Sequence, residues 1–525
     1  MRNGLSKDLI ARVLGGAPKY TIDELEAKFP ERNLPDGAYV TRFAPSPTGY
    51  MHLGGLYSAL IDYKLAKQSG GLFLLRIEDT DTKREVKEAV DIIINSLAEF
   101  GIKNDNDEVY GPYYQSQRRD IYHSVAADLL AKGLAYPCFL TQQEMDEIRE
   151  KQKAAGFATG IYGEFARDRD ISDEEIIKHL DNGEIPSIRL YSTGNPEQRI
   201  FCKDAVRGSI SVPENNEDIV LIKSTDRLPT YHFAHLCDDH FMRVTHVVRG
   251  EEYFGTVALH IQMFHMMGWN LPAYIHTATL DKIDADTGKQ RKLSKRHDPE
   301  ANVAFFLQDG WPTDAVVDYL GNILASGYED ARMKGQVKSF WDYELRPKKI
   351  PTSGSLFDMK KLEWWAKEYI ATLPVPDLVK YVVDWANEYG TDINKMQVSD
   401  TAYLTSVLAI ERDNPKRIRK DFITWKQTLD EVSYFWDELF VANKEFEFNK
   451  DVLNEFLATF DINDDKDTWW NKIVAVATKL GIKNGDAAMN LRVAMSGRTN
   501  TPDLYSIMQV MGEVRVRERV KGASK

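Results

Sequence analysis

Short apolar runs and longer segments with helical spacing alternate over the first part of the chain. Residues 38–44 are apolar and β-prone, and they run into the Pro- and Gly-rich residues 45–49, which break regular structure. Apolar positions then recur at helical spacing over 56–67, until two glycines at 70–71 end the pattern. Residues 72–77 are almost continuously apolar, as in a strand buried on both faces of a parallel sheet. This order predicts a βαβ unit.

The pattern further along predicts that this sheet is interrupted and then completed. Apolar positions over 86–97 give a second amphipathic helix, which favours an open, doubly wound sheet. Over about 113–216 the alternation is lost, and a charged helical segment at 142–153 belongs to this insert. Strand-like sequence returns at 218–222 and 241–248. We therefore predict an α/β fold, a doubly wound Rossmann-type parallel sheet with an inserted domain.

Beyond about residue 300 the sequence reads as helical to its end, with a further boundary near residues 374–376. The 525 residues are enough for about three or four domains. The formal charge is -13, from 67 Lys and Arg against 80 Asp and Glu. A nucleic-acid partner must therefore bind local basic patches, because the overall field repels it.

Cysteine usage and the N-terminal segment favour the cytoplasm. Cys138, Cys202 and Cys237 form no CxxC pair, which argues against a disulfide framework and against a four-ligand zinc site. The N-terminal segment lacks the apolar core of a secretory signal, and no stretch approaches the roughly 20 apolar residues of a membrane span. We expect a cytoplasmic protein with no membrane partner.

The first chemical element is the segment RFAPSPTGYMHLGG at 42–55, where the first strand ends and a helix begins. Backbone N–H groups at a helix start bind anions, and Gly54 and Gly55 let the backbone approach a phosphate closely. His52 would donate to phosphate oxygens as charge shifts in a transition state. The alternative is a Pro- and Gly-rich loop with an incidental histidine.

The second element is the sequence KLSKR at 292–296, which contains Lys292 and Lys295. A polar, Gly-containing stretch at 284–289 precedes it and is predicted to be a mobile loop. Flexible cations on such a loop can clamp a polyphosphate. The alternative is a solvated basic run.

Together, the two elements resemble the signature pair of class I aminoacyl-tRNA synthetases. Four stretches narrow the resemblance to bacterial glutamyl-tRNA synthetases, namely RFAPSPTGYMHLGG, LLRIEDTD (74–81), PTYHFAHLCDDH (229–240) and VVRGEE (247–252). The resemblance covers about residues 39–525 and is most specific in the catalytic half.

The resemblance assigns roles to residues that match the family's positions one by one. The glutamate-binding set is Arg42, Ala44, Ser46, Glu78, Tyr231, His235 and Arg249. The ATP-binding set is His52, Gly54, Gly55, Glu252, Leu280 and Lys295, and the catalytic set is His52, Lys292 and Lys295. ATP is then a substrate, and Mg²⁺ is expected to bridge the oxygens of the leaving pyrophosphate.

Charge complementarity agrees with the implied amino-acid site. Arg42, with Tyr231, matches the group that faces the side-chain carboxylate of glutamate, and Arg249 matches the group that faces the α-carboxylate. Buried carboxylates suit arginine, which offers two parallel hydrogen bonds. Glu78 matches the carboxylate that receives the α-ammonium, with Ser46 beside it. A structural ion pair between Arg42 and Glu78 is the alternative.

The sequence departs from the family's pattern at two places. His235 stands where the family usually has Asn, so one polar contact to the side-chain carboxylate is expected to change, and His titrates near neutrality. Some relatives carry a zinc-binding Cys cluster in the insert, but here Leu140 follows Cys138 where a second Cys would stand. We therefore predict no zinc, and Cys202 and Cys237 are expected to be small buried residues.

Basic sequence in the C-terminal half favours tRNA binding. Residues 412–426 hold six basic and two acidic residues, with Phe422 and Trp425 available for base stacking. The last 35 residues hold seven Lys or Arg against three acidic residues. A solvated helix face is the alternative for each run. The resemblance implies a helical anticodon domain at the end of the chain.

With the resemblance, the expected divisions follow in chain order. They are an N-terminal extension (1–38), the first half of the Rossmann catalytic domain (39–112), an inserted domain that binds the tRNA acceptor (113–216), the second catalytic half (217–300), a helical stem-contact domain (301–374) and a helical anticodon-binding domain (375–525).

The implied activity is that of a glutamate–tRNA ligase. Glutamate attacks the α-phosphate of ATP to give glutamyl-adenylate, and the acyl group then passes to the 3′ end of tRNA(Glu). Two other interpretations stay open. A glutaminyl-tRNA synthetase is disfavoured by HLGG and by the helical C-terminal half, and a catalytically silent tRNA-binding relative is disfavoured by the charged residues in both signature regions. We expect a monomer.

Overall fold

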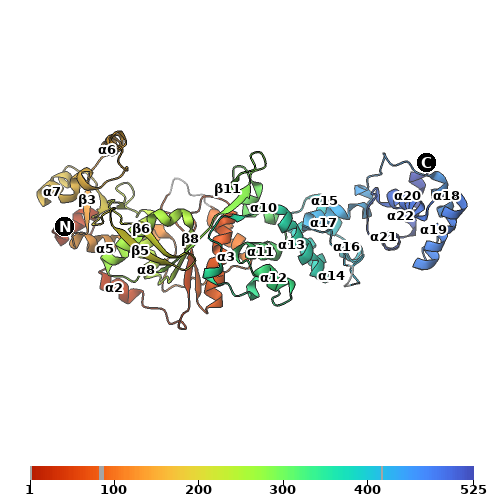
Figure 1. Cartoon of the computed structure of the whole chain (residues 1–525), viewed down its shortest axis with the longest axis horizontal. Coiled ribbons are helices and arrows are strands. Elements are labelled where there is room, and N and C mark those ends of the chain that lie inside the picture. The colour runs from red at the N-terminus through yellow and green to blue at the C-terminus, as the bar shows by residue number, and fades with distance from the viewer. Residues whose placement is uncertain (1–2, 82–87, 415–417) are drawn as a thin grey trace. The chain divides into compact units, whose positions relative to one another are not determined.

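The computed structural model describes residues 3–81, 88–414 and 418–525 and divides into two compact units (Figure 1). The first unit is Met1–Val303 with Leu320–Phe357, and the second is Ala304–Tyr319 with Asp358–Lys525. The boundary expected near residue 374 lies inside the second unit.

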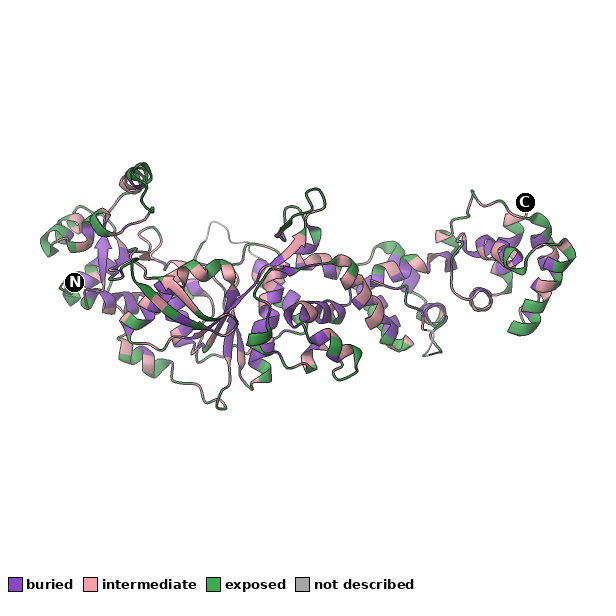
Figure 2. Cartoon of the chain, viewed as in Figure 1, coloured by how far each residue is buried: buried purple, intermediate pink, exposed green. Residues whose placement is uncertain are grey.

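A parallel sheet lies at the centre of the first unit, as the hydrophobic pattern predicted. Its elements are β1 (Val40–Phe43), α3 (Leu53–Gln68), β2 (Leu72–Leu75), β8 (His246–Gly250), α9 (Val257–Met267) and β9 (Ala273–Thr277). β1 pairs with β2, and β8 pairs with β9, both in parallel. The two pairs lie side by side, since the Thr245 amide donates to the Val40 carbonyl at 2.9 Å. Most strand positions are buried (Figure 2), which explains their continuous apolar sequence. The α/β prediction is confirmed.

The second predicted helix is α4 (Ala89–Glu99), which buries Ala89, Ile93 and Leu97. Val86, expected at its start, lies outside the described residues.

The strand predicted at 241–248 is shorter than the sequence indicated. α8 (Tyr231–Phe241) occupies its first residue, and β8 begins at His246. Between them Arg243 has a φ of 58°, a left-handed value that no strand contains. Buried Phe241 and Met242 therefore read as strand residues although they end a helix.

The insert contains a small antiparallel sheet of its own. The helices and strands of this region are α5 (Arg119–Ala131), β3 (Ala135–Cys138), α6 (Gln142–Ala155), α7 (Asp173–Asp181), β4 (Ser187–Leu190), β5 (Arg199–Asp204), β6 (Gly208–Pro213) and β7 (Val220–Ile222). The sheet itself consists of β3, β4 and β7. β7 was expected in the parallel sheet, but it pairs with β4. The β5–β6 hairpin instead reaches the parallel sheet, where Asp204 pairs with Tyr274 of β9. A short apolar run predicts a strand but not its partner.

The N-terminal extension is part of the first unit. It forms α1 (Lys7–Leu14) and α2 (Ile22–Lys28), and the apolar residues that it buries are Leu5, Leu9, Ile10, Val13, Leu14, Leu25 and Phe29. The Phe29 ring lies 5.7 Å from that of Phe241, and the carboxylate of Glu26 pairs with His240 at 2.6 Å. The extension therefore packs directly on α8.

The predicted loop at 284–289 is the tip of an antiparallel hairpin. Its strands are β10 (Leu280–Ile283) and β11 (Gln290–Lys292), and β12 (Ser355–Leu356) adds to the edge of β10. Asp284 accepts hydrogen bonds from the backbone and hydroxyl of Thr287, both at 2.9 Å. The stretch is therefore the turn of a hairpin, and its predicted mobility stays a prediction.

The α-helices of the remaining described residues follow in chain order. They are α10 (Val303–Gln308), α11 (Thr313–Leu324), α12 (Tyr328–Met333), α13 (Met359–Thr372), α14 (Val375–Glu388), α15 (Asp392–Val398), α16 (Thr401–Leu408), α17 (Trp425–Glu431), α18 (Lys450–Thr459), α19 (Lys466–Leu480), α20 (Asn484–Ser496), α21 (Leu504–Met511) and α22 (Glu513–Ala523). Over the described residues, none of the helices is both long and apolar enough to span a bilayer.

The aromatic residues proposed for base stacking lie in the core of the second unit. Phe422 is 1% exposed and Trp425 is 7% exposed, and the Trp425 ring stacks on Tyr381 with centroids 5.4 Å apart. The stacking prediction is wrong because these aromatics pack inward between basic neighbours. Residues 415–417 of this basic run lie outside the described residues.

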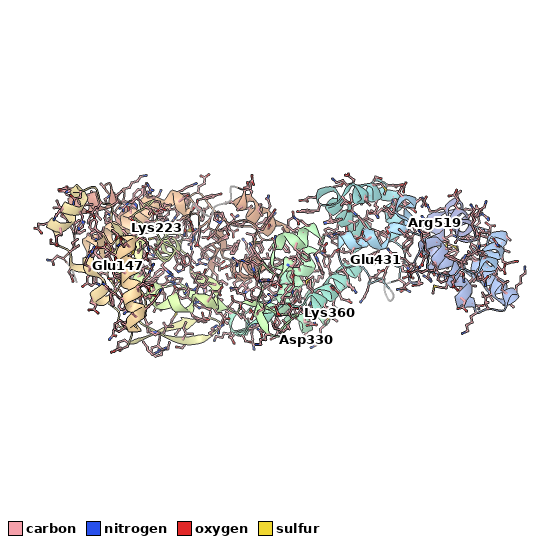
Figure 3. The ribbon with its side chains drawn as sticks, turned by 90° about the horizontal axis from the view of Figure 1, so that it is seen from above. Glu147, Lys223, Asp330, Lys360, Glu431 and Arg519 are labelled. Carbon is pink, nitrogen blue, oxygen red and sulfur yellow. The ribbon has the colours of Figure 1, made fainter. Side chains whose placement is uncertain are left out.

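The C-terminal basic run is partly internal as well. Arg519, labelled in Figure 3, is buried and donates to the carbonyls of Tyr434 and Met495, both at 2.8 Å. Arg515 pairs with Asp437 at 3.0 Å. Several cations that the sequence suggested for tRNA therefore hold the unit together.

Candidate active site

A cleft of about 450 Å³ opens at the carboxyl ends of β1, β8 and β9. The predicted site residues that line it are Arg42, Ala44, Ser46, His52, Gly54, Gly55, Glu78, Tyr231, Arg249, Glu252, Leu280 and Lys292. Only Lys295 and His235 of the predicted set do not line it. Segments far apart in the sequence meet here because parallel strands end at one edge of a sheet.

The helix that follows β1 begins at this cleft and is capped by His52. The Nδ1 atom of His52 accepts a hydrogen bond from the Gly54 amide at 2.9 Å, so this nitrogen is occupied by the helix start. A Cβ at Gly54 would lie 3.1 Å from the ring, and one at Gly55 would lie 3.3 Å from Phe43. Burial and the nearby cation of Lys295 lower the pKa of His52. A neutral histidine and two glycines leave room for an anionic group.

The two lysines of the KLSKR sequence lie in different places. Lys292, at the end of β11, lines the cleft and pairs with Glu252 at 3.0 Å. Lys295 contacts the carbonyl of Tyr50, outside the cleft. Lys292 is therefore a cation of the cleft itself, whereas Lys295 lies on the loop beside it.

Arg42 belongs to a buried network of ion pairs. Its Nε atom lies 3.1 Å from the Oδ1 atom of Asp239, and the same carboxylate pairs with Arg76 at 2.5 Å. The next residue, Asp238, pairs with Arg118 at 2.7 Å. Arg42 therefore pairs with Asp239 and not with Glu78, so the structural ion pair that it forms has another partner than the alternative proposed. This network holds the guanidinium at the floor of the cleft.

His235 lies behind Arg42. It is fully buried, and its Nδ1 atom is 3.3 Å from Nη2 of Arg42, which always donates. Burial, Arg42 and Arg249 hold the pKa of His235 well below its usual value. His235 is therefore neutral and acts on the cleft through Arg42.

Glu78 is the acidic group of the cleft. Its carboxylate lies 3.5 Å from the Nη2 atom of Arg76. Burial raises its pKa to about 7, although Arg76 and Arg42 oppose this effect. Glu78 can therefore change its charge near neutral pH.

Sequence reasoning missed several residues of the site. Tyr253 lines the cleft one position beyond Glu252, and Asp62, on α3, lines it as well. Burial raises the pKa of Asp62 well above its usual value. The acidic pair in LCDDH was a signal for the Arg42 partner, whereas nothing in the sequence marked Asp62.

A second cleft of about 550 Å³ shares Ser46, Glu78 and Tyr231 with the first. Lys223, labelled in Figure 3, lines it and donates to the carbonyl of Thr80 at 2.9 Å. The two clefts therefore have the residues around Glu78 in common.

The second unit has a cleft of its own, of about 500 Å³. Among its lining residues are Arg419, Lys420, Tyr434 and Arg498, together with Glu431, which is labelled in Figure 3 and pairs with Arg498 at 2.5 Å. The cations and the Tyr434 ring suit contacts to a nucleotide, and the acidic residues Glu411, Asp421 and Glu431 line the cleft as well.

The three cysteines are not part of a group of metal-ligating side chains in the portion of the chain that the structure describes. All three are free and buried. Within the described ranges, no group of three or more His, Cys, Asp and Glu side chains is arranged to hold a metal ion. The expectation of no zinc stays a prediction.

Comparison with known proteins finds a match for each half of the chain. The model of the catalytic domain of class I tRNA synthetases (E and Q) matches residues 38–364, and that of an anticodon binding domain matches residues 377–524. A glutamate–tRNA ligase of Clostridium perfringens is 42% identical over 98% of this chain and 99% of its own, and one of Acetivibrio thermocellus is 44% identical over 94% and 95%. The crystal structure of the glutamate-tRNA synthetase from Elizabethkingia anophelis has a TM-score of 0.76 at 28% identity, covering 93% of this chain and 99% of that one.

Proposed function

This chain belongs to the class I tRNA synthetases for glutamate and glutamine, and on that premise we propose that it is a glutamate–tRNA ligase. The observation that carries the proposal is a single cleft in which Arg42, Arg249 and Glu78 face a glycine-rich helix start and Lys292. Two cations and one carboxylate match the two carboxylates and the ammonium of glutamate. The glycines and the lysine match the phosphates of ATP.

Different residues of the cleft would bind the three charged groups of glutamate. Arg42, with Tyr231, would receive the side-chain carboxylate, and Arg249 would receive the α-carboxylate. Glu78, in its ionised form, would pair with the α-ammonium, with Ser46 beside it and the backbone of Ala44 at the wall. His235 would act indirectly, because it contacts Arg42 and does not line the cleft.

Activation is an in-line attack of the α-carboxylate on the α-phosphate of ATP. His52 and the Gly54–Gly55 helix start would hold the phosphates, and Glu252 and Leu280 would line the nucleotide site. Lys292 would balance the charge that develops on pyrophosphate, and Lys295 would join it from the adjacent loop. Mg²⁺ would enter with ATP, held by phosphate oxygens. The protein acts mainly by positioning and by charge, without a covalent intermediate.

Transfer requires the 3′ end of tRNA to reach the adenylate. The second cleft, which is lined by Lys223 and shares Glu78 with the first, would admit that end. The cleft lined by Arg419 and Arg498 would receive a nucleotide of the anticodon. We also propose that the enzyme is cytoplasmic and that it is a monomer. Light scattering of the purified protein would test the oligomeric state.

Glutaminyl activity and a silent, tRNA-binding role are the two alternatives. The retained charged cleft opposes the silent role, and the names of relatives more than 40% identical over nearly the whole chain favour glutamate. The test is ATP–pyrophosphate exchange with glutamate and with glutamine, each with and without tRNA, followed by charging of purified tRNA(Glu) and tRNA(Gln). Exchange with glutamate and charging of tRNA(Glu) are expected. Exchange with glutamine alone, or none at all, would overturn the proposal.

A further inference from the structure

Arg249 is a buried cation with an unusual set of partners. Its side chain is 6% exposed, and its Nε atom donates to Nε2 of His276 at 2.9 Å. Its Nη1 atom donates to Nδ1 of His260 at 3.0 Å. The guanidinium also lies 4.4 Å from the centroid of the Tyr274 ring. Across residues 3–81, 88–414 and 418–525, no carboxylate lies within 4.0 Å of it.

Arg42, on the neighbouring strand, shows the more usual arrangement. Its Nε atom pairs with the carboxylate of Asp239, which offsets its charge. The two arginines of the cleft therefore differ in whether a protein carboxylate offsets their charge. Arg42 is held by an anion, whereas Arg249 is held by two neutral rings and keeps its full charge.

The orientation of both imidazoles follows from their second nitrogen atoms. The Nδ1 atom of His276 lies 2.7 Å from a carboxylate oxygen of Asp204, so it carries the proton and leaves Nε2 to accept from Arg249. Since Nδ1 of His260 accepts from Arg249, its Nε2 atom carries the proton and donates to Nδ1 of His232 at 3.0 Å. Each acceptor therefore points at the guanidinium because of a hydrogen bond on its far side.

Asp204 is fixed by further bonds of its own. It lies at the end of β5, and its carboxylate also accepts from the backbone amides of Val206, Arg207 and His276, at 2.9, 2.8 and 3.0 Å. The strand that reaches the parallel sheet from the insert therefore sets the ring of His276. This gives β5 a role in the site that its distance in sequence does not suggest.

One donor of Arg249 has no protein partner. The Nη2 atom is buried and meets no acceptor in the part of the chain that the structure describes. Since Arg249 lines the cleft, an anion that enters there would find one free donor and an uncompensated charge. A carboxylate in place of either imidazole would hold the arginine equally well, but it would also neutralise the charge and repel the incoming anion.

We propose that His260 and His276 are positioning residues that hold Arg249 through neutral acceptors, so that its charge is reserved for the α-carboxylate of the substrate. This inference rests on the proposed function, in which Arg249 faces that carboxylate. The environment supports it, because burial together with Arg249 lowers the pKa of both histidines, although Asp204 opposes the shift at His276. Both rings therefore remain neutral acceptors.

The test compares variants that keep an acceptor with variants that remove it. Asn places an amide oxygen near the position of Nδ1, and Gln places one near Nε2, so His260→Asn and His276→Gln are the conservative pair. His260→Leu and His276→Leu are the disruptive pair. His246→Leu is the matched control, because His246 lies on the same strand as Arg249 but stacks on Tyr39.

Exchange kinetics of the full-length protein, with tRNA present, give three readings. They are KM for glutamate, KM for ATP, and the inhibition constant of 4-aminobutyrate, which has the side-chain carboxylate and the ammonium but no α-carboxylate. Loss of one hydrogen bond to a charged group predicts a rise of about 10- to 150-fold in KM for glutamate in each Leu variant. His260→Asn and His276→Gln should recover most of it. The other two readings, and His246→Leu, should stay within about twofold of wild type.

Two results would overturn the inference. One is a wild-type KM for glutamate in both Leu variants. The other is a parallel loss of affinity for ATP and 4-aminobutyrate, which marks a general collapse of the cleft. Arg249→Gln separates this failure from that of the premise. If Arg249→Gln weakens glutamate and 4-aminobutyrate equally, the α-carboxylate assignment is wrong. If it weakens glutamate alone while the Leu variants have no effect, only the role of the histidines is wrong.

Discussion

Glu78 should give glutamate activation a pH dependence that the structure defines. Burial raises the pKa of this carboxyl from 4.5 to about 7. Only the ionised form can pair with the α-ammonium of glutamate. As the pH falls through the raised pKa, the protonated form accumulates in the free enzyme, so glutamate binding should weaken.

The size of the effect follows from that pKa. At pH 6 about one-tenth of Glu78 would be ionised, a penalty of about 1.4 kcal/mol, so kcat/KM for glutamate should fall about tenfold from its plateau near pH 8. An ordinary glutamate would give a flat profile over this range. Glu78→Gln removes both the titration and a charged hydrogen bond, and it should lower kcat/KM at pH 8 by about 10- to 150-fold.

The assay is ATP–pyrophosphate exchange with tRNA, at saturating ATP and varied glutamate, for wild type and Glu78→Gln from about pH 6 to 8. Titrations of ATP and of His52 affect both proteins, so the ratio of their kcat/KM values isolates Glu78. We expect that ratio to rise about tenfold over the range. A constant ratio would refute the reasoning, since it would mean that Glu78 does not titrate there or does not contact the ammonium.

Three further predictions concern the same cleft and the insert. Arg42→Ala should reduce the preference for glutamate over glutamine, by up to the roughly 30-fold to several-thousand-fold that a lost buried charge partner represents. Arg249→Ala should instead weaken the binding of both substrates alike. The measurement is kcat/KM for each amino acid, and the opposite pattern would mean that the two arginines are assigned the wrong way round. Lys295→Ala should slow adenylate formation by orders of magnitude with tRNA affinity nearly unchanged, and a wild-type rate in rapid-quench experiments would contradict this. Treatment with a chelator, followed by its removal and the return of Mg²⁺, should leave charging activity intact, because Cys138 has no second cysteine beside it. Elemental analysis that finds about one zinc per chain would reverse this prediction.

Much of the site was predictable because the family resemblance named its residues, and several of them follow short, strongly patterned strands. Residues 72–77 are nearly all apolar, which identified the strand that leads to Glu78. The glycines after residue 52 identified the start of α3. Since parallel strands end at one edge, residues named separately along the sequence were expected to meet, and the cleft that they line agrees with this.

What the sequence could not reveal depends on contacts between distant segments. The pairing of Arg42 with Asp239, and the bonds of Arg249 to His260 and His276, join residues that no local pattern relates. The partner of β7 was wrong for the same reason. Phe422 shows the opposite error, because a charged neighbourhood suggested an exposed face while the ring itself is buried.

The packing of the N-terminal extension bears on how this catalytic unit can be cut or exchanged. The matched catalytic domain begins at residue 38, yet Phe29, Leu25 and Val13 are buried against helices that lie within it. The burial of each such side chain contributes about 1.5–3 kcal/mol to the stability of the fold. A fragment that starts at residue 38 would therefore expose an apolar surface on α5 and α8, which favours aggregation. A chimera that borrows α8 from a relative would also have to borrow the segment that covers it. The folded unit is thus longer than the matched catalytic domain.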